Sequence, residues 1–160
     1  ERSRIYDVVE SVEKILDAFA GVCPFSVSLA SKGCKVTAVD SNPDSEIWAR
    51  ENFRRNKIPE SRYEFFCSKI EQILPELKLY DRIIMNSPTT SLNFLPSLSN
   101  KLKTGGVIHL YNIIENKVDF KIENYLSSNF KCIGERVVHP YSPSSSLVVF
   151  DIVKAEENVR

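Results

Sequence analysis

The chain has 160 residues, 42 % of them hydrophobic, which is enough for one domain with a sizeable core. Its 21 basic and 21 acidic residues balance, and this argues against a stand-alone RNA-binding module, which is usually basic. No apolar run approaches membrane-spanning length and no signal-peptide pattern opens the chain, so we expect a cytoplasmic protein without membrane contact.

Cysteine spacing bears on metal binding and on the cellular compartment. The four cysteines lie far apart with no C-x-x-C pair, so the spacing argues against zinc. Each stands in an apolar context, which predicts buried thiols in a reducing compartment. They are Cys23, Cys34, Cys67 and Cys132.

Helical and strand patterns alternate along the chain. Helices are predicted at 2–9, 24–31, 43–57, 69–77, 92–103 and 118–129. Strands are predicted at 12–17, 34–39, 63–67, 81–86, 105–111, 130–138 and 146–153. Alternation indicates a mainly parallel sheet with right-handed crossovers, whereas the last two strands, joined by the loop "HPYSPSS", should pair antiparallel. We therefore expect an α/β, Rossmann-like, seven-stranded sheet of the class I methyltransferase type over residues 1–154, with a frayed tail at 155–160.

Polar residues follow the apolar runs at the strand ends, and ligands of such sheets bind at that edge. Gly21 follows the first strand and lets backbone approach a ligand. Asp40 ends the second strand, where a carboxylate can accept both hydroxyls of a ribose. Cys23 and Pro24 stand where a pyrophosphate would need glycines, so S-adenosylmethionine, with ribose and adenine but no phosphate, fits better. The alternative is that Gly21 is only a turn and Asp40 only a helix cap.

The segment "DRIIMNSP" adds a second indication. Asn86-Ser87-Pro88 resembles the Asn-Pro-Pro-aromatic signature of amino-group methyltransferases, in which the asparagine helps to hold a planar nitrogen. Thr89 occupies the aromatic position, and this argues against methylation of an adenine or cytosine amino group. A simple Asn-Ser-Pro turn remains the alternative.

Together the segments "ERSRI", "LDAFAGVCPFS", "AVDSNP", "ENFRRNKI", "DRIIMNSP", "GGVIHLYN" and "YSPSSSLVVFDI" resemble one family over nearly the whole chain. They are similar to the catalytic domain of the archaeal and eukaryotic tRNA (guanine-37) N1-methyltransferases. In that family a tRNA-docking region precedes the "ER-R" helix, so we expect this chain to be an excised piece of a longer protein. The missing part would then supply much of the grip on tRNA, and the protein is expected to act as a monomer.

The resemblance implies roles for individual residues. Glu1 would be the general base that takes the N1 proton of guanine, because protonated N1 is a poor nucleophile. Arg2 would bind phosphate or the guanine face, Asn86 would orient the base and the methionine moiety, and Pro88 would shape the pocket. The implied cofactor-binding residues are Phe19, Ala20, Gly21, Asp40, Ser41, Ser68 and Asn86.

The chain departs from the family pattern at two positions. Cys23 replaces a second glycine, and Ser68 stands where an aspartate holds the adenine amino group, so its hydrogen bond would be neutral and weaker. Each change is expected to cost roughly 1 kcal/mol of cofactor affinity. These departures keep a non-catalytic RNA-binding domain open as an alternative. A wybutosine-pathway aminocarboxypropyl transferase is a further one, although such relatives tend to lose the asparagine found here at Asn86.

Remaining clusters give weaker indications. One helix carries Arg50, Arg54 and Arg55, followed by Lys57, which could contact tRNA phosphates but more often form a solvated face. His109 lies inside a predicted strand and is expected to be a hydrogen-bonded core residue. His139, at the mouth of the last hairpin, is a candidate for lining the target-base pocket.

Overall fold

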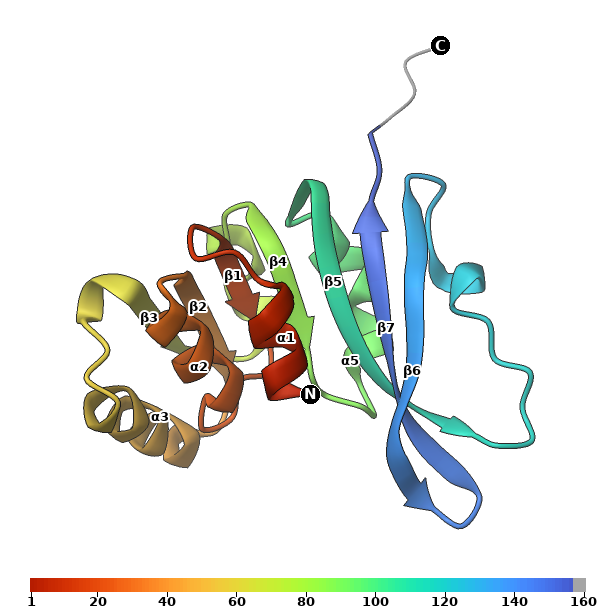
Figure 1. The fold of residues 1–160 in the computed structure, drawn as a ribbon, viewed down its shortest axis with the longest axis horizontal. Coiled ribbons are helices and arrows are strands. Elements are labelled where there is room, and N and C mark those ends of the chain that lie inside the picture. The colour runs from red at the N-terminus through yellow and green to blue at the C-terminus, as the bar shows by residue number, and fades with distance from the viewer. Residues whose placement is uncertain (157–160) are drawn as a thin grey trace. The chain divides into compact units, whose positions relative to one another are not determined.

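A computed structural model describes residues 1–156. The strands are β1 (Lys14–Asp17), β2 (Lys35–Asp40), β3 (Tyr63–Cys67), β4 (Tyr80–Met85), β5 (Leu102–Glu115), β6 (Phe130–Ser142) and β7 (Ser145–Lys154). The helices are α1 (Arg2–Val8), α2 (Pro24–Lys32), α3 (Pro43–Arg55), α4 (Ile70–Ile73) and α5 (Ser91–Ser99), with 3₁₀ turns η1 (Glu60–Arg62), η2 (Leu74–Glu76) and η3 (Ile122–Tyr125). The strand order is β3-β2-β1-β4-β5-β7-β6, so the predicted seven-stranded α/β fold is confirmed (Figure 1).

The chain clusters into two compact units, Glu1–Tyr80 and Asp81–Arg160. In the first unit β1, β2 and β3 are parallel, and their last residues therefore lie at one edge. Strand β2 reads as a nearly continuous buried run, as expected of a parallel strand that is covered on both faces. Helix α2 packs against β2 and also contacts α1, whereas α3 packs against β2 and β3 (Figure 1).

Local sequence explains where α2 begins and ends. Pro24 occupies the first turn, where its missing N–H costs nothing. Gly33 ends the helix with φ 117°, and its N–H is directed at the carbonyls of Ala30 and Leu29. Such a left-handed residue at a helix end is the conformation that glycine adopts most readily. The helix therefore delivers the chain back to the start of β2.

In the second unit the antiparallel hairpin of β6 and β7 confirms the predicted pairing of the last two strands. The expected loop "HPYSPSS" is wrong, however, because Pro140 pairs with Ser146 and Ser142 with Ser145. Three register shifts interrupt β6, between Cys132/Gly134, Val137/His139 and Pro140/Ser142. Since β6 pairs only with β7 in the strand order, an edge strand with bulges can accommodate a proline that donates no hydrogen bond.

The helix predicted at 118–129 is also wrong, since only the short turn η3 forms there. Ile122 is buried, but Val118 and Tyr125 are 54 % and 50 % exposed. Helices in proteins are stabilised mainly by packing of an apolar face, and one buried side chain does not provide it. Polar residues that bond to nearby backbone then favour turns.

Burial corrects part of the cysteine prediction. Cys23 and Cys34 are buried as expected, whereas Cys67 is exposed and Cys132 is half-buried.

The predicted frayed tail begins with a residue that is hydrogen-bonded, because Ala155 donates its N–H to the Asn129 carbonyl. Residues 157–160 of that tail lie outside the described part of the chain. Within residues 1–156, no helix is long and apolar enough to cross a bilayer.

Candidate functional site

The turn after β1 is fastened to the end of β2 by Asp40. One carboxylate oxygen of Asp40 accepts from Gly21 N–H at 2.9 Å, and the other accepts from Asn42 N–H at 2.9 Å. The backbone adds a bond from Ala20 N–H to the Val39 carbonyl at 2.9 Å. Because an ionised carboxylate has about four acceptor positions, Asp40 can still accept from a ligand. The structure thus brings Gly21 and Asp40 together, as the sequence spacing predicted.

Gly21 leaves open space over this turn. Its φ is 54°, and a Cβ built on it would meet no heavy atom within 4 Å. The open space and the positive φ together explain why glycine suits this position. Phe19, two residues before Gly21, is half-buried. Val22, the residue after Gly21, is exposed and its carbonyl accepts a hydrogen bond from the Asn52 side chain at 2.9 Å.

Asp17, at the end of β1, is a site residue that the sequence reasoning did not single out. It is 1 % exposed, and its Oδ2 accepts from the Ser26 hydroxyl at 2.7 Å. Its Oδ1 has no hydrogen-bond partner among the described residues. Burial raises the pKa of this carboxyl from 3.8 to about 6, and the hydrogen bond from Ser26 offsets part of that effect. The sequence signal that could have identified it is an acid at the end of a predicted strand, four residues before Gly21.

Cys23 is the unusual residue of the turn. It has φ 65° and ψ 42°, a left-handed conformation that few residues other than glycine adopt, and its side chain is fully buried. The thiol lies 3.9 Å from the Gly21 carbonyl oxygen, and burial raises its pKa, so the thiol is unreactive. Because glycine adopts this conformation most readily, the side chain of Cys23 strains the backbone at the start of α2.

Ser41 and Ser68 follow the ends of the next two strands. Ser41 is exposed, and the adjacent Asn42 caps α3 by accepting from Asp44 N–H. Ser68 N–H donates to the Asp40 carbonyl at 3.0 Å, so Ser68 does lie beside the end of β2. The Ser68 hydroxyl is turned toward the Lys69 carbonyl and the Gln72 side chain.

The segment Asn86-Ser87-Pro88 lies in the second unit, and hydrogen bonds fix its backbone before and after Asn86. Ser91 accepts from Ser87 N–H at 3.0 Å and donates to the Met85 carbonyl at 2.8 Å. The Pro88 carbonyl accepts from Ile113 N–H of β5 at 3.2 Å. Asn86 is half-buried, and its carboxamide has no hydrogen-bond partner among residues 1–156. The backbone is thus fixed while the amide group remains available.

Glu1 occupies the N-cap position of α1, and Arg4 binds its carboxylate. Arg4 Nε and a terminal guanidinium nitrogen lie 3.1 Å and 3.0 Å from the same Glu1 oxygen. The Glu1 side chain is only 13 % exposed, whereas Arg2 is exposed. Arg4 therefore positions the predicted base, a role that the i, i+3 spacing of the "ER-R" segment could have indicated.

The two histidines differ in surroundings. His109 is 2 % exposed, with Nε2 2.7 Å from Arg82 and Nδ1 2.5 Å from Asp151. Because a guanidinium can only donate, Nε2 accepts and the Nδ1 proton faces Asp151. His109 is thus a hydrogen-bonded core residue, as predicted. His139 is exposed on β6, and its Nδ1 lies 2.9 Å from the Pro140 carbonyl.

The basic residues of α3 are neutralised within their own helix. Arg50 pairs with Glu46 at 2.7 Å, and Arg54 and Arg55 pair with Glu51 at 2.8 Å and 2.7 Å. These two arginines hold the pKa of Glu51 at about 2 through their hydrogen bonds. The solvated-face interpretation of this cluster is therefore favoured over contact with phosphates.

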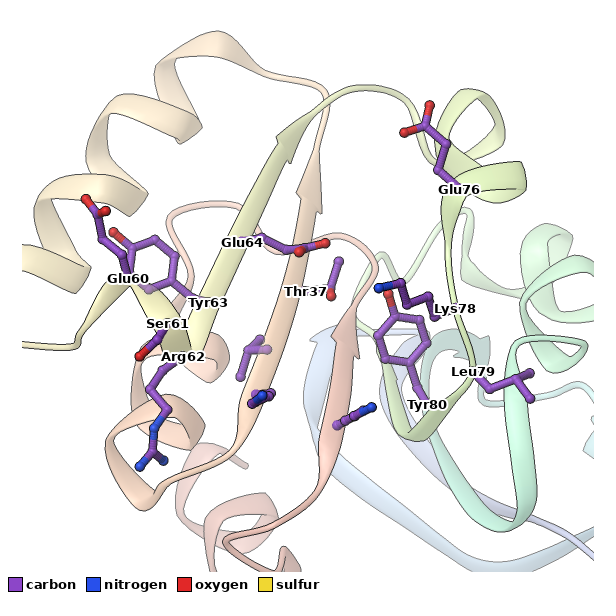
Figure 2. A pocket seen from close by; sticks show the side chains of 13 residues that line it. Thr37, Glu60, Ser61, Arg62, Tyr63, Glu64, Glu76, Lys78, Leu79 and Tyr80 are labelled. Carbon is purple, nitrogen blue, oxygen red and sulfur yellow. The ribbon is translucent and has the colours of Figure 1, made fainter.

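A hollow of about 320 Å³ lies at the other end of the first unit's strands (Figure 2). Its lining includes Lys14, Lys35 and Tyr63, which are the first residues of β1, β2 and β3. Ligands of parallel sheets bind at the carboxyl ends, so this hollow is not the cofactor site that the sequence predicts.

Comparison with known proteins supports the prediction of a methyltransferase domain. Residues 1–136 match the model of the TRM5/TYW2 methyltransferase domain. Trm5b of Pyrococcus abyssi, a tRNA (guanine(37)-N(1))-methyltransferase, is 29 % identical over 163 residues, covering 94 % of this chain and 47 % of that protein.

Two solved structures are similar over almost the whole chain. Trm5 of Methanocaldococcus jannaschii in complex with adenosine has a TM-score of 0.84 at 26 % identity, covering 98 % of this chain and 48 % of that one. The complex of aTrm5 with tRNALeu has a TM-score of 0.83 at 28 % identity, covering 97 % of this chain and 45 % of that one. This chain thus spans about half the length of each of these three proteins. Since the family model covers most of its residues, the chain belongs to the TRM5/TYW2 methyltransferase domain family.

Proposed function

We propose that this chain is the catalytic domain of an S-adenosylmethionine-dependent enzyme that methylates N1 of guanine 37 in tRNA. The observation that carries the proposal is the turn between β1 and α2. There a buried acid with an unpartnered oxygen, Asp17, precedes an open glycine, Gly21, which is bonded to the second acid, Asp40.

These residues fit the cofactor by donor and acceptor type. Asp40 would accept from the ribose hydroxyls with the acceptor positions that Gly21 and Asn42 leave unused. The unpartnered Oδ1 of Asp17 suits the cofactor's ammonium group, because a buried carboxylate requires a charged or hydrogen-bonding partner. The space over Gly21 admits ligand atoms close to the backbone. Ser68 N–H is already used by the Asp40 carbonyl, so only the Ser68 hydroxyl could serve the adenine.

When bound, S-adenosylmethionine supplies an electrophilic methyl group. The chain must then remove the guanine N1 proton, because the neutral ring nitrogen that carries it is a poor nucleophile. Glu1 would accept this proton on its carboxylate, with Arg4 fixing the orientation of that carboxylate. Asn86 would hold the guanine edge through its carboxamide, and Pro88 would give that segment its fixed backbone.

The partner would be tRNA, as the name of the Pyrococcus relative and the aTrm5 complex suggest. Because those relatives are about twice as long as this chain, the remaining half of such a protein would supply further tRNA contacts. We further propose that the enzyme acts as a monomer in the cytoplasm.

A second candidate is transfer of the cofactor's aminocarboxypropyl group, because the family description includes TYW2 as well as TRM5. Asn86 favours methyl transfer, since its carboxamide is positioned in a fixed segment and has no partner among the described residues.

The test is mass mapping of nucleosides after the full-length protein has been incubated with unmodified tRNA and S-adenosylmethionine. We expect a methyl group on N1 of guanine 37, reduced at limiting S-adenosylmethionine in Asp40→Ala and retained in Asp44→Ala, an exposed aspartate in the first turn of α3. An aminocarboxypropyl adduct would establish the second candidate. No modified nucleoside, together with no heat of cofactor binding in calorimetry, would show that the domain is non-catalytic.

A further inference from the structure

Two polar side chains, those of Ser68 and Gln72, meet just beyond the end of β3. The Ser68 hydroxyl lies 3.3 Å from the Gln72 carboxamide oxygen and 3.2 Å from the Lys69 carbonyl, with both oxygens placed to accept from it. Gln72 is exposed, and its carboxamide has no other hydrogen-bond partner among residues 1–156. An exposed amide oriented by a hydroxyl is therefore available to a ligand at this strand end.

The short helix α4 determines where Gln72 lies. Ile70 and Ile73 are 4 % and 6 % exposed, so they anchor this single turn in the core. The backbone N–H of Gln72 donates to the Lys69 carbonyl at 3.0 Å. With buried isoleucines before and after it, Gln72 directs its carboxamide to the solvent beside Ser68.

The Ser68–Gln72 pair is next to Asp40, the proposed ribose acceptor. Cys67, the last residue of β3, is the register partner of Asp40 at the end of β2. Ser68 N–H donates to the Asp40 carbonyl at 3.0 Å. Because neighbouring strands lie about 4.8 Å apart, the side chains that follow β3 begin about one strand spacing from Asp40.

Strand order indicates the direction in which the cofactor extends from Asp40. Under the proposed function, its ammonium group meets Asp17 at the end of β1 and its ribose meets Asp40 at the end of β2. The order β3-β2-β1 places β3 on the other side of β2 from β1. The methionine part and the adenine are attached at opposite ends of the ribose, so the adenine would lie over the end of β3.

Adenine carries an amino group, which donates and therefore requires an acceptor. Lys69 is a cation and can only donate. Glu46, the acid of α3 that interacts with the end of β3, is paired with Arg50 at 2.7 Å. The carboxamide oxygen of Gln72 has two acceptor positions, and Ser68 can occupy only one of them. Gln72 thus offers the acceptor that the adenine amino group needs.

We propose that Gln72 selects adenine in the cofactor, by accepting a hydrogen bond from the adenine amino group on its carboxamide oxygen. Ser68 is the positioning residue, because its hydroxyl orients that oxygen. The identity of the nucleoside rests on the proposed function.

The test compares adenosine with purine riboside, which lacks the amino group, as competitors of labelled S-adenosylmethionine for the full-length protein. The parent protein should prefer adenosine by about 5- to 10-fold, which corresponds to one neutral hydrogen bond. Gln72→Ala should abolish this preference and Ser68→Ala should reduce it. Gln72→Glu should increase it, because a charged acceptor bonds more strongly. Glu71→Ala, at an exposed position of the same helical turn, should leave it unchanged, and Asp40→Ala should weaken both nucleosides equally.

An unchanged preference in Gln72→Ala would overturn the proposal, as would a preference lost in Glu46→Gln but kept in Gln72→Ala. Methyl transfer to guanine 37 by a parent protein that binds the two nucleosides equally would also overturn it, and would leave the proposed function intact. If the preference depends on Gln72 while no guanine 37 product forms, Gln72 selects adenine and only the assigned reaction is wrong.

Discussion

Asp17 offers the sharpest test of the site, because its burial affects both the stability of the chain and the binding of the cofactor. Its carboxyl is 1 % exposed, with one oxygen bonded to Ser26 and the other without a partner among residues 1–156. Substitution by Asn keeps the shape and the Ser26 bond but removes the ionisable group. The two proteins should therefore differ in how stability depends on pH.

The size of the effect follows from the pKa. Burial raises it from 3.8 to about 6, so the folded state holds a proton more tightly than the unfolded state. The contribution to stability is complete below pH 3.8 and is lost as pH rises through 6. At about 1.4 kcal/mol per pKa unit, the full loss is roughly 3 kcal/mol. Between pH 4 and 7, Asp17→Asn should lack a decline of about 2–3 kcal/mol that the parent chain shows.

Urea unfolding at several pH values, without cofactor, measures this difference. Ser26→Ala serves as a matched variant, since loss of the hydrogen bond that lowers the Asp17 pKa should move the decline to higher pH. Parallel stability profiles for the parent chain and Asp17→Asn would refute the reasoning.

The same carboxyl should control cofactor binding. Because an ammonium group pairs with the ionised form, S-adenosylmethionine affinity should fall about tenfold per pH unit below pH 6. Asp17→Asn should bind weakly at every pH. Calorimetry that finds equal affinity in the two proteins would remove Asp17 from the site.

Three further predictions concern neighbouring residues. Asp40→Ala should weaken S-adenosylmethionine binding by about 1.5–3 kcal/mol in calorimetry, the contribution of hydrogen bonds to a charged acceptor, and unchanged affinity would contradict this assignment. Cys23→Gly should be more stable than Cys23→Ala by about 1 kcal/mol in urea unfolding, because φ 65° strains any residue with a Cβ, and the reverse order would show an unstrained turn. Glu1→Gln should lower single-turnover methyl transfer about 10²- to 10⁴-fold without changing cofactor affinity, and equal rates would leave proton removal to another group.

The sequence was sufficient for the fold because its strands and helices are marked by local patterns. The β-branched run before Asp40 and the proline at the start of α2 lie where the structure has a strand and a helix start. The helix predicted at 118–129 does not form because its apolar residues lack a surface to pack against, and Val118 and Tyr125 remain exposed. The two strands of the final hairpin are longer than predicted, because prolines in an edge strand do not stop strand pairing.

The site was only partly predictable. Gly21 and Asp40 were identified because their spacing spans one strand–helix–strand unit, and the structure joins them at 2.9 Å. The sequence prediction assigned a role to Arg2, the neighbour of Glu1, whereas the structure shows that Arg4, at i, i+3, binds the Glu1 carboxylate.

Asp17 and Asp40 show why chemistry at strand ends cannot be assigned from pattern alone. Both are aspartates that end buried parallel strands, yet Asp40 receives two backbone N–H bonds whereas Asp17 receives one hydroxyl and keeps an unpartnered oxygen. The difference comes from how α2 leaves the turn, with Cys23 held at positive φ and Ser26 directed at Asp17. A buried acid of raised pKa and a strained residue therefore lie within one short turn. Such local costs persist at sites where a ligand compensates for them. If the cofactor is that ligand, its binding should remove the ionisation penalty of Asp17 and stabilise the chain most above pH 6.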